Sequence, residues 1–187
     1  MLKKIPYSEL RPILQRFELS HDAAAVISGD MLPTQAVELL QIKELYTDLV
    51  NFYSHALPMR EAIWWACLVL DIRSDVWSVE ERQAIADSKS WVQEPNEARR
   101  RLAEQQVESL GHQCAPGWLA QAVFWNGNGS LSEPGQPVVL PPEYLYAKAV
   151  AGAINIAAVI PEWQQHEAYY QKVSDIALSL ARGGSGL

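Results

Sequence analysis

Helical periodicity is the feature that most constrains how this chain can fold. From about residue 20 onward, apolar residues recur at spacings of three and four, which is typical of helices with one buried face. The segment "MREAIWWACLVL", residues 59–70, is apolar nearly all round after Glu61, which predicts a central helix. No segment alternates convincingly between apolar and polar residues, and prolines flank the one β-branched patch, "PVVL". The sequence therefore predicts an all-α fold.

Capping residues and helix breakers divide this pattern into about seven or eight helices. We predict a single irregular bundle over residues 1–187, with a short N-terminal arm (about 1–18) and a flexible C-terminal tail (183–187). No motif recurs at a fixed period, which disfavours a solenoid of repeats. The expected helices are 20–28 closed by Gly29, a single helix from a Thr34 cap to Ala56, 59–70, a Ser78–Glu81 capping box to Val92, Pro95 to Gly111, 116–125, Pro142 to Ile160, and 162–182.

Large and small side chains identify the expected core. The central helix is predicted to bury Ala62, Ile63, Ala66, Cys67 and Leu70. A second helix, "AKAVAGAINIAAV", is built of small residues that allow a neighbouring helix to approach closely, and its Asn155 would then need a hydrogen-bond partner. Seven tryptophans divide into two groups. We expect Trp64, Trp65, Trp118 and Trp125 in the core, and Trp77, Trp91 and Trp163 half-exposed near helix ends, where they could anchor a partner.

Charge and composition limit the classes of partner. The formal net charge of −7 opposes general attraction to nucleic acid or anionic lipid. The one basic run, Arg99 to Arg101, lies among glutamates, and we interpret it as a solvated helix face. No signal peptide is apparent, and the longest near-apolar helix, 144–160, falls short of the roughly 20 residues that span a bilayer. We therefore expect a cytoplasmic protein that does not insert into membranes.

Candidate chemical groups are few. His112 lies near Cys114, and "HEAYY" resembles the start of a metalloprotease motif but has Tyr170 where the second histidine should be. Two cysteines 47 positions apart form neither a disulfide framework nor a zinc motif. The two Asn-Gly steps at 126–129 could cradle phosphate, but they follow a helix, so we interpret them as a helix stop and a turn. No catalytic, metal or cofactor site is predicted.

The stretch "FWNGNGSLSEPGQPVVLPPEYLYAKAVAGA", residues 124–153, is the least ordinary part of the chain. It contains a long connection, Asn126 to Pro141, and connections of this length are usually functional or disordered. The prolines at 134, 137, 141 and 142 favour order, because they restrict the unfolded loop. We predict an ordered surface loop whose outer side contacts a partner; the alternative is a mere connection between distant helix ends. The predicted contact residues are Trp125, Asn126, Asn128, Leu131, Pro134 and Pro137.

Three blocks of sequence resemble a known family. "HALPMREAIWWACL", the stretch "APGWLAQAVFWNGNGSLSEPGQPVVLPPEYLYAKAVAGAINIAA" and "ALSLARG" are similar in content and order to an uncharacterised bacterial family, a domain of unknown function. The similarity covers roughly Leu39 to Gly183. The resemblance implies a Gram-negative origin and frequent proximity to type VI secretion genes, and it supplies no catalytic residues.

Two functions from different classes remain open at this point. The first is a non-enzymatic adaptor or chaperone-like accessory protein that binds a secretion-system component or effector. The second is an enzyme, hydrolase-like, that uses His112 or His166 on a helical scaffold. An exposed apolar surface would favour the adaptor, and a deep pocket gathering His, Asp or Glu would favour the enzyme.

Overall fold

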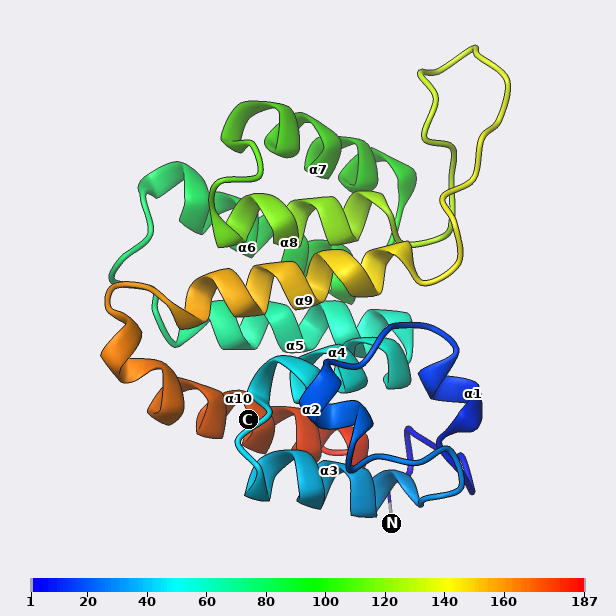
Figure 1. Ribbon diagram of the computed structural model, residues 1–187. Coiled ribbons are helices and arrows are strands. Elements are labelled where there is room, and N and C mark those ends of the chain that lie inside the picture. The colour runs from blue at the N-terminus through cyan, green and yellow to red at the C-terminus, as the bar shows by residue number, and fades with distance from the viewer. Residues whose placement is uncertain (1, 187) are drawn as a thin grey trace.

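The computed structural model describes residues 2–186, and every regular element in this part of the chain is a helix (Figure 1). The predicted all-α class is confirmed, with more helices than expected because several are short or interrupted. The elements are α1 (Arg11–Leu14), α2 (His21–Ala24), α3 (Pro33–Ile42), α4 (Tyr46–Ala56), α5 (Met59–Asp71), α6 (Val79–Gln93), α7 (Glu97–Leu110), α8 (Ala115–Phe124), α9 (Leu145–Ala158), the 3-10 helix η1 (Trp163–Gln165) and α10 (His166–Ala181).

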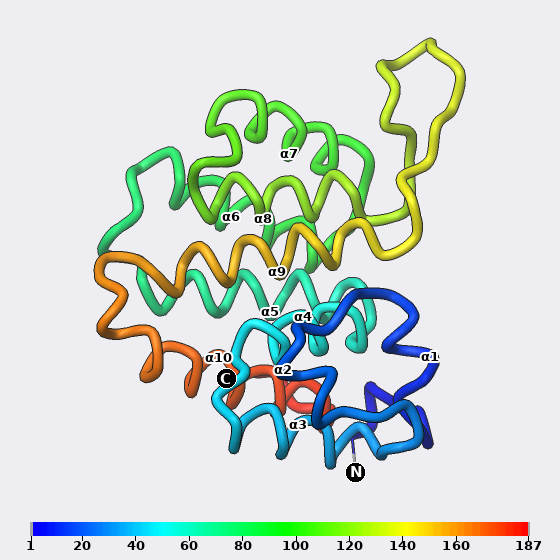
Figure 2. The backbone as a smooth tube through the Cα atoms, viewed as in Figure 1, coloured from blue at the N-terminus to red at the C-terminus, as the bar shows by residue number. Residues whose placement is uncertain are grey.

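The helices pack around α5, α8 and α9. Helix α8 contacts α6, α7 and α9, while α9 also contacts α4 and α5. Helix α5 in turn contacts α6 and α10 (Figure 1). The backbone trace shows one long projection, which leaves the body between the end of α8 and the start of α9 (Figure 2). This projection is the proline-rich connection that the sequence singles out.

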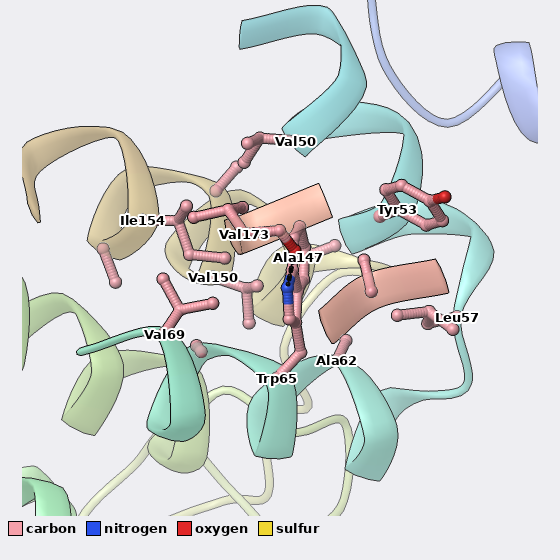
Figure 3. Packing of buried hydrophobic residues seen from close by; sticks show 14 of the residues in the cluster. Val50, Tyr53, Leu57, Ala62, Trp65, Val69, Ala147, Val150, Ile154 and Val173 are labelled. Carbon is pink, nitrogen blue, oxygen red and sulfur yellow. Dashed lines mark hydrogen bonds between the residues drawn. The ribbon is translucent and has the colours of Figure 1, made fainter. Parts of the chain in front are cut away.

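Helix α5 lies at the centre of the core, as its composition predicts. All five of its expected core residues have no exposed surface, which confirms that prediction. Beside them, Trp65 donates a hydrogen bond from Nε1 to the carbonyl of Val173 on α10 (2.9 Å), so this buried indole has its polar group satisfied (Figure 3). Asn155 of the small-residue helix is half-buried and accepts a hydrogen bond from the Tyr170 hydroxyl (2.9 Å), the kind of partner it was expected to need.

Both chain ends pack against the body within the described residues. In the segment predicted as an arm, Leu2, Ile5, Leu10 and Ile13 are buried in the core. The N–H of Lys4 donates to the carbonyl of Ala181 (2.9 Å), which brings the two ends side by side. The predicted tail also makes contacts, because the carbonyl of Ser185 accepts a hydrogen bond from Trp64 Nε1 (3.0 Å). Leu187 lies outside the described residues.

The single helix predicted from Thr34 to Ala56 is wrong, because the chain breaks it into α3 and α4. Glu44 has φ +56°, a left-handed conformation that cannot continue a right-handed helix. The N–H of Leu45 then donates to the carbonyl of Leu40 (2.9 Å), which closes the end of α3. Leu32, and not Thr34, precedes the first turn of α3.

Two further helix starts differ from the prediction. Helix α9 begins at Leu145, not at Pro142, because Tyr144 has φ +59° and interrupts the right-handed turn. Helix α7 is capped by Asn96, whose Oδ1 accepts a hydrogen bond from Arg99 N (2.9 Å), so Pro95 precedes the cap. The Ser78–Glu81 capping box is present as predicted.

The prediction for the helix-end tryptophans is wrong for two of three. Trp77 and Trp91 are buried at 4% and 3% exposure, because both rings pack into the common core. Trp163 alone is exposed (57%) and stacks on His166. Of the four expected core tryptophans, Trp65 is fully buried, and the other three, Trp64, Trp118 and Trp125, are partly buried against the core.

No single helix among the described residues is long and apolar enough to cross a membrane. Helix α9 and the segment Trp163–Ala181 meet the length and composition criteria only together, and the chain bends by 110° between them.

Candidate functional site

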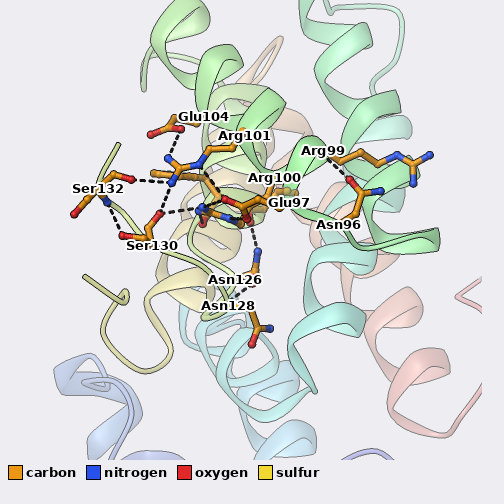
Figure 4. A network of polar contacts seen from close by, with 12 residues as sticks. Asn96, Glu97, Arg99, Arg100, Arg101, Glu104, Asn126, Asn128, Ser130 and Ser132 are labelled. Atoms are coloured by element: carbon orange, nitrogen blue, oxygen red, sulfur yellow. Dashed lines mark hydrogen bonds and ion pairs between the residues drawn. The ribbon is translucent and has the colours of Figure 1, made fainter. Parts of the chain in front are cut away.

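The projecting loop is held at its base by Arg100 of α7. This guanidinium donates to both carboxylate oxygens of Glu97 (2.7 Å each) and to the carbonyls of Phe124 (3.1 Å) and Ser130 (2.9 Å) (Figure 4). Arg100 is 1% exposed, so the interpretation of the basic run as a solvated face is wrong for this residue. These hydrogen bonds lower the pKa of the Glu97 carboxyl, which keeps the pair charged.

Arg101 adds a second attachment on the neighbouring part of the loop. Its Nη2 donates to the carbonyls of Ser130 (3.1 Å) and Ser132 (2.7 Å), while Glu97 and Glu104 hold the rest of the guanidinium. The arginine run therefore does not present three solvated charges. Two of the three side chains connect α7 to the loop, and the carbonyls that they bind would otherwise lack partners in this irregular segment.

Gly129 allows the loop to pass close to Arg100. A Cβ at this position would lie 2.6 Å from Arg100 Nε, and its φ of +95° is one that other residues rarely adopt. Asn126 fixes the preceding turn, because its side-chain amide donates to the Val123 carbonyl (2.8 Å) and its Oδ1 accepts from Asn128 N (2.8 Å). The Asn-Gly steps thus form a helix stop and a turn, consistent with their interpretation from the sequence.

Beyond its base, the loop has the form of a short hairpin. Leu131 N donates to the Val139 carbonyl (2.7 Å), and Val139 N donates to Ser130 Oγ (3.0 Å). At the far end, Gln136 N donates to the Glu133 carbonyl (3.1 Å), with Pro134 and a Gly135 of φ +89° between them. Proline followed by a glycine of positive φ is the pattern of a type II turn. The loop is therefore braced at its base, along its arms and at its tip.

The outer arm of this hairpin exposes three consecutive aliphatic side chains. Val138, Val139 and Leu140 are 74%, 52% and 59% exposed. The backbone groups of Val139 face the opposite arm, so the N–H groups of Val138 and Leu140 point away from it and bond to no described residue. We call residues 138–140 the outer arm. It combines exposed apolar side chains with unpaired backbone donors on a braced projection.

The comparison with known families covers most of the molecule. A family model, described as a family of unknown function (DUF6931), matches residues 36–181. The chain belongs to this family. The DUF6931 region begins within α3 and ends with α10, so it includes both arginines and the whole loop and leaves out α1 and α2. No curated protein and no solved structure matches the chain.

Within this DUF6931 member, the predicted contact residues divide between the base and the outside of the loop. Asn126 is buried (4% exposed) and Trp125 is half-buried, so both belong to the base. Leu131 is half-buried at the start of the inner arm. The residues that offer open surface are Asn128, Pro134 and Pro137. The structure thus brings the predicted residues onto one loop but gives them different surroundings.

The arginine anchors and the outer arm were not predicted from the sequence. Arg100, Ala103 and Val107 share one face of α7, at spacings of three and seven, and the other two face inward. That spacing is the signal that could have revealed a buried arginine. The outer arm lies in the "PVVL" patch, the one β-branched segment, whose flanking prolines argue against a strand within a sheet.

Each histidine of the enzyme alternative bonds a residue close to it in the sequence. His112 donates from Nε2 to Gln121 Oε1 (2.8 Å) and packs against Trp118. Cys114 makes no hydrogen bond with His112, and burial raises the pKa of its thiol, which disfavours a thiolate nucleophile. His166 bonds the Trp163 carbonyl through Nδ1 (2.6 Å). Among residues 2–186, no three His, Cys, Asp or Glu side chains gather as a metal site would require.

Proposed function

We propose that this protein is a non-enzymatic adaptor that binds another protein through its projecting loop. The observation that supports the proposal is the exposed run Val138, Val139 and Leu140 on a segment braced by Arg100 and Arg101. Exposed aliphatic side chains in contiguous runs are costly in water and mark interaction surfaces. A braced loop also loses little conformational entropy on binding, which favours affinity.

The geometry of the outer arm favours one mode of recognition. The N–H groups of Val138 and Leu140 bond to no described residue, so an extended segment of the partner could pair with the outer arm as an added strand. In that mode, backbone hydrogen bonds give affinity, and alternate side chains give specificity. The exposed Pro134 and Pro137 at the tip would flank this contact.

The biological setting of the partner rests on the resemblance noted from the sequence. We propose a component or an effector of a bacterial type VI secretion system as the partner, and the cytoplasm as the compartment. The net charge of −7 supports a protein partner in preference to nucleic acid or an anionic membrane.

A triple substitution tests the adaptor proposal. Val138→Thr, Val139→Thr and Leu140→Gln remove exposed apolar surface without touching the arginine anchors. We expect an unchanged Tm and a loss of partner capture in pull-downs from native cells analysed by mass spectrometry. The matched control replaces two exposed aliphatic residues elsewhere, Ile42→Thr and Val79→Thr, which are 75% and 69% exposed, and should keep capture.

A second variant distinguishes a binding loop from a spacer. It replaces Leu131 to Gln136 with a Gly/Ser linker of equal length. Capture that persists in both loop variants, with folded protein, would remove the binding role and leave a connection between α8 and α9. A collapse of Tm in the linker variant would show that the hairpin is part of the fold.

A further inference from the structure

Arg73 is a buried cation without a carboxylate partner. It lies in the turn after α5 and is 7% exposed, and its buried Nε has no hydrogen-bond partner among the described residues. Its guanidinium makes a cation–π contact with Tyr169, and the distance from Arg73 Cζ to the ring centroid is 4.4 Å. Buried charges are costly unless they are paired, and Arg100, similarly buried, has every part of its guanidinium engaged. Arg73 therefore has unused capacity to bind an anion.

Arg73 lines a cleft of about 580 Å³ between the turn that follows α5 and the first turns of α10. We call this the Arg73 cleft, and its volume falls in the range of small-molecule sites, roughly 300–1,000 Å³. Tyr169 also lines it, and its hydroxyl has no partner among the described residues. Burial raises the pKa of Tyr169, so the phenol keeps its proton and remains a hydrogen-bond donor.

The charges that line the cleft define the class of ligand. Arg73 and Lys172 are positive and Asp75 is negative, which leaves an excess of one positive charge in a chain whose net charge is −7. A ligand with a single negative charge would balance that excess. The planar guanidinium matches the two oxygens of a carboxylate, and the apolar side chains of Ile72 and Val76 favour a ligand with an organic portion.

We propose that the Arg73 cleft binds a small organic carboxylate. Its carboxylate would accept hydrogen bonds from Arg73, with Lys172 adding a second positive charge, and its apolar part would lie against Ile72 and Val76. The proposal is independent of the adaptor role, because the cleft is lined by the turn after α5 and by the start of α10, and these segments lie on the other side of the molecule from the projecting loop (Figure 1).

Titration with matched probes tests this site. Phenylacetate and its neutral analogue phenylacetamide are added to protein labelled for NMR observation of the arginine Nε–Hε groups and tyrosine rings. We expect saturable shifts of Arg73 and Tyr169 with phenylacetate and binding at least about tenfold weaker for the amide, which carries no charge to pair with the guanidinium. Inorganic phosphate is titrated in parallel as a different oxyanion.

Variants assign the effect to the cleft. Arg73→Met keeps the aliphatic stem and should weaken phenylacetate binding by at least about tenfold. Lys43→Met removes one exposed charge outside the cleft and should bind as the natural protein does. If Arg73→Met does not fold, Lys172→Met provides the second measurement and should also weaken binding.

Three results would overturn the proposal. They are the absence of any saturable shift with phenylacetate, equal binding of the acid and the amide, and unchanged binding in folded Arg73→Met. Tighter binding of inorganic phosphate than of phenylacetate would instead identify a phosphate site, and the carboxylate assignment would fail.

Discussion

His55 shows how burial controls the chemistry of a single residue in this fold. It lies near the end of α4, is 1% exposed and stacks on Phe17. Its Nδ1 bonds the Asn51 carbonyl (2.8 Å), and its Nε2 has no partner among the described residues. Burial lowers the pKa of His55 below its ordinary 6.5, and the positive charges of Lys148 and Arg16 lower it further. The folded protein therefore holds this ring neutral.

Because the pKa of His55 is lower in the folded state than in the unfolded state, we expect the protein to be less stable in mild acid. The unfolded state binds a proton at the ordinary pKa of 6.5, whereas the folded state binds it only at lower pH. The contribution of His55 to the free energy of unfolding is therefore full above pH 6.5. It decreases as the pH falls from the unfolded-state pKa to the lower folded-state pKa. The measurement is urea unfolding between about pH 8 and about pH 5, the range in which histidine charge changes.

A histidine comparison isolates this effect. His55→Gln should lose less stability on acidification than the natural protein, because the titrating group is gone. His21→Gln, at an exposed position, should keep the full acid sensitivity. An identical pH dependence in His55→Gln and the natural protein would show that other groups cause the acid loss.

At the scale of elements, helix α8 depends on a glycine and a tryptophan that are adjacent in sequence. A Cβ at Gly117 would lie 2.0 Å from the carbonyl oxygen of Gly111, so only glycine lets the end of α7 approach the first turn of α8. Trp118 then covers Gly152 of α9, where a Cβ would lie 3.3 Å from the indole, and donates from Nε1 to the His112 carbonyl (3.0 Å). This pair connects α7, α8 and α9, the helices that carry the loop.

Gly117→Ala should destabilise the protein by about 1–3 kcal/mol, the usual cost of forcing extra atoms into a packed interior. Gly152→Ala is the matched control, because there the nearest atoms belong to a side chain and need to shift by only a few tenths of an ångström. Chemical unfolding of both variants gives the comparison. Equal and small effects would mean that the contact between α7 and α8 is looser than the geometry indicates.

At the scale of the whole molecule, one apolar core joins the two ends of the chain. It extends from Leu2 to Ala181 and includes α1, which lies outside the DUF6931 match. Both cysteines are free, and burial raises the pKa of the Cys67 thiol at the centre of the core. Apolar burial therefore stabilises the described part of the fold without a disulfide.

Chelator and reductant should each leave the Tm unchanged. A destabilisation of 1 kcal/mol shifts the Tm of a domain of this size by about 2–4 °C, so even a weak structural metal or thiol contribution would be measurable by calorimetry. A fall of several degrees with chelator would indicate a metal site, and the same fall with reductant would indicate a role for Cys67 or Cys114.

Apolar spacing, capping residues and helix breakers were enough to predict the helical class, the buried face of α5, the Ser78–Glu81 cap of α6 and the position of the long loop. These features depend on residues close together in the chain, through apolar spacing and local hydrogen bonds. The break at Glu44 and the left-handed Tyr144 were not predictable in this way, because neither residue type favours positive φ.

The polar contacts of the loop and of the Arg73 cleft join residues that are far apart in the chain. Arg100 reaches Ser130 across 30 positions of sequence, and Arg73, in the turn after α5, meets Tyr169 of α10, which is distant in the chain. The residues next to these arginines in the sequence do not indicate that they are buried or which groups they contact, because both depend on how separate helices pack. The loop anchor and the Arg73 cleft therefore became visible only when those helices were placed together in three dimensions.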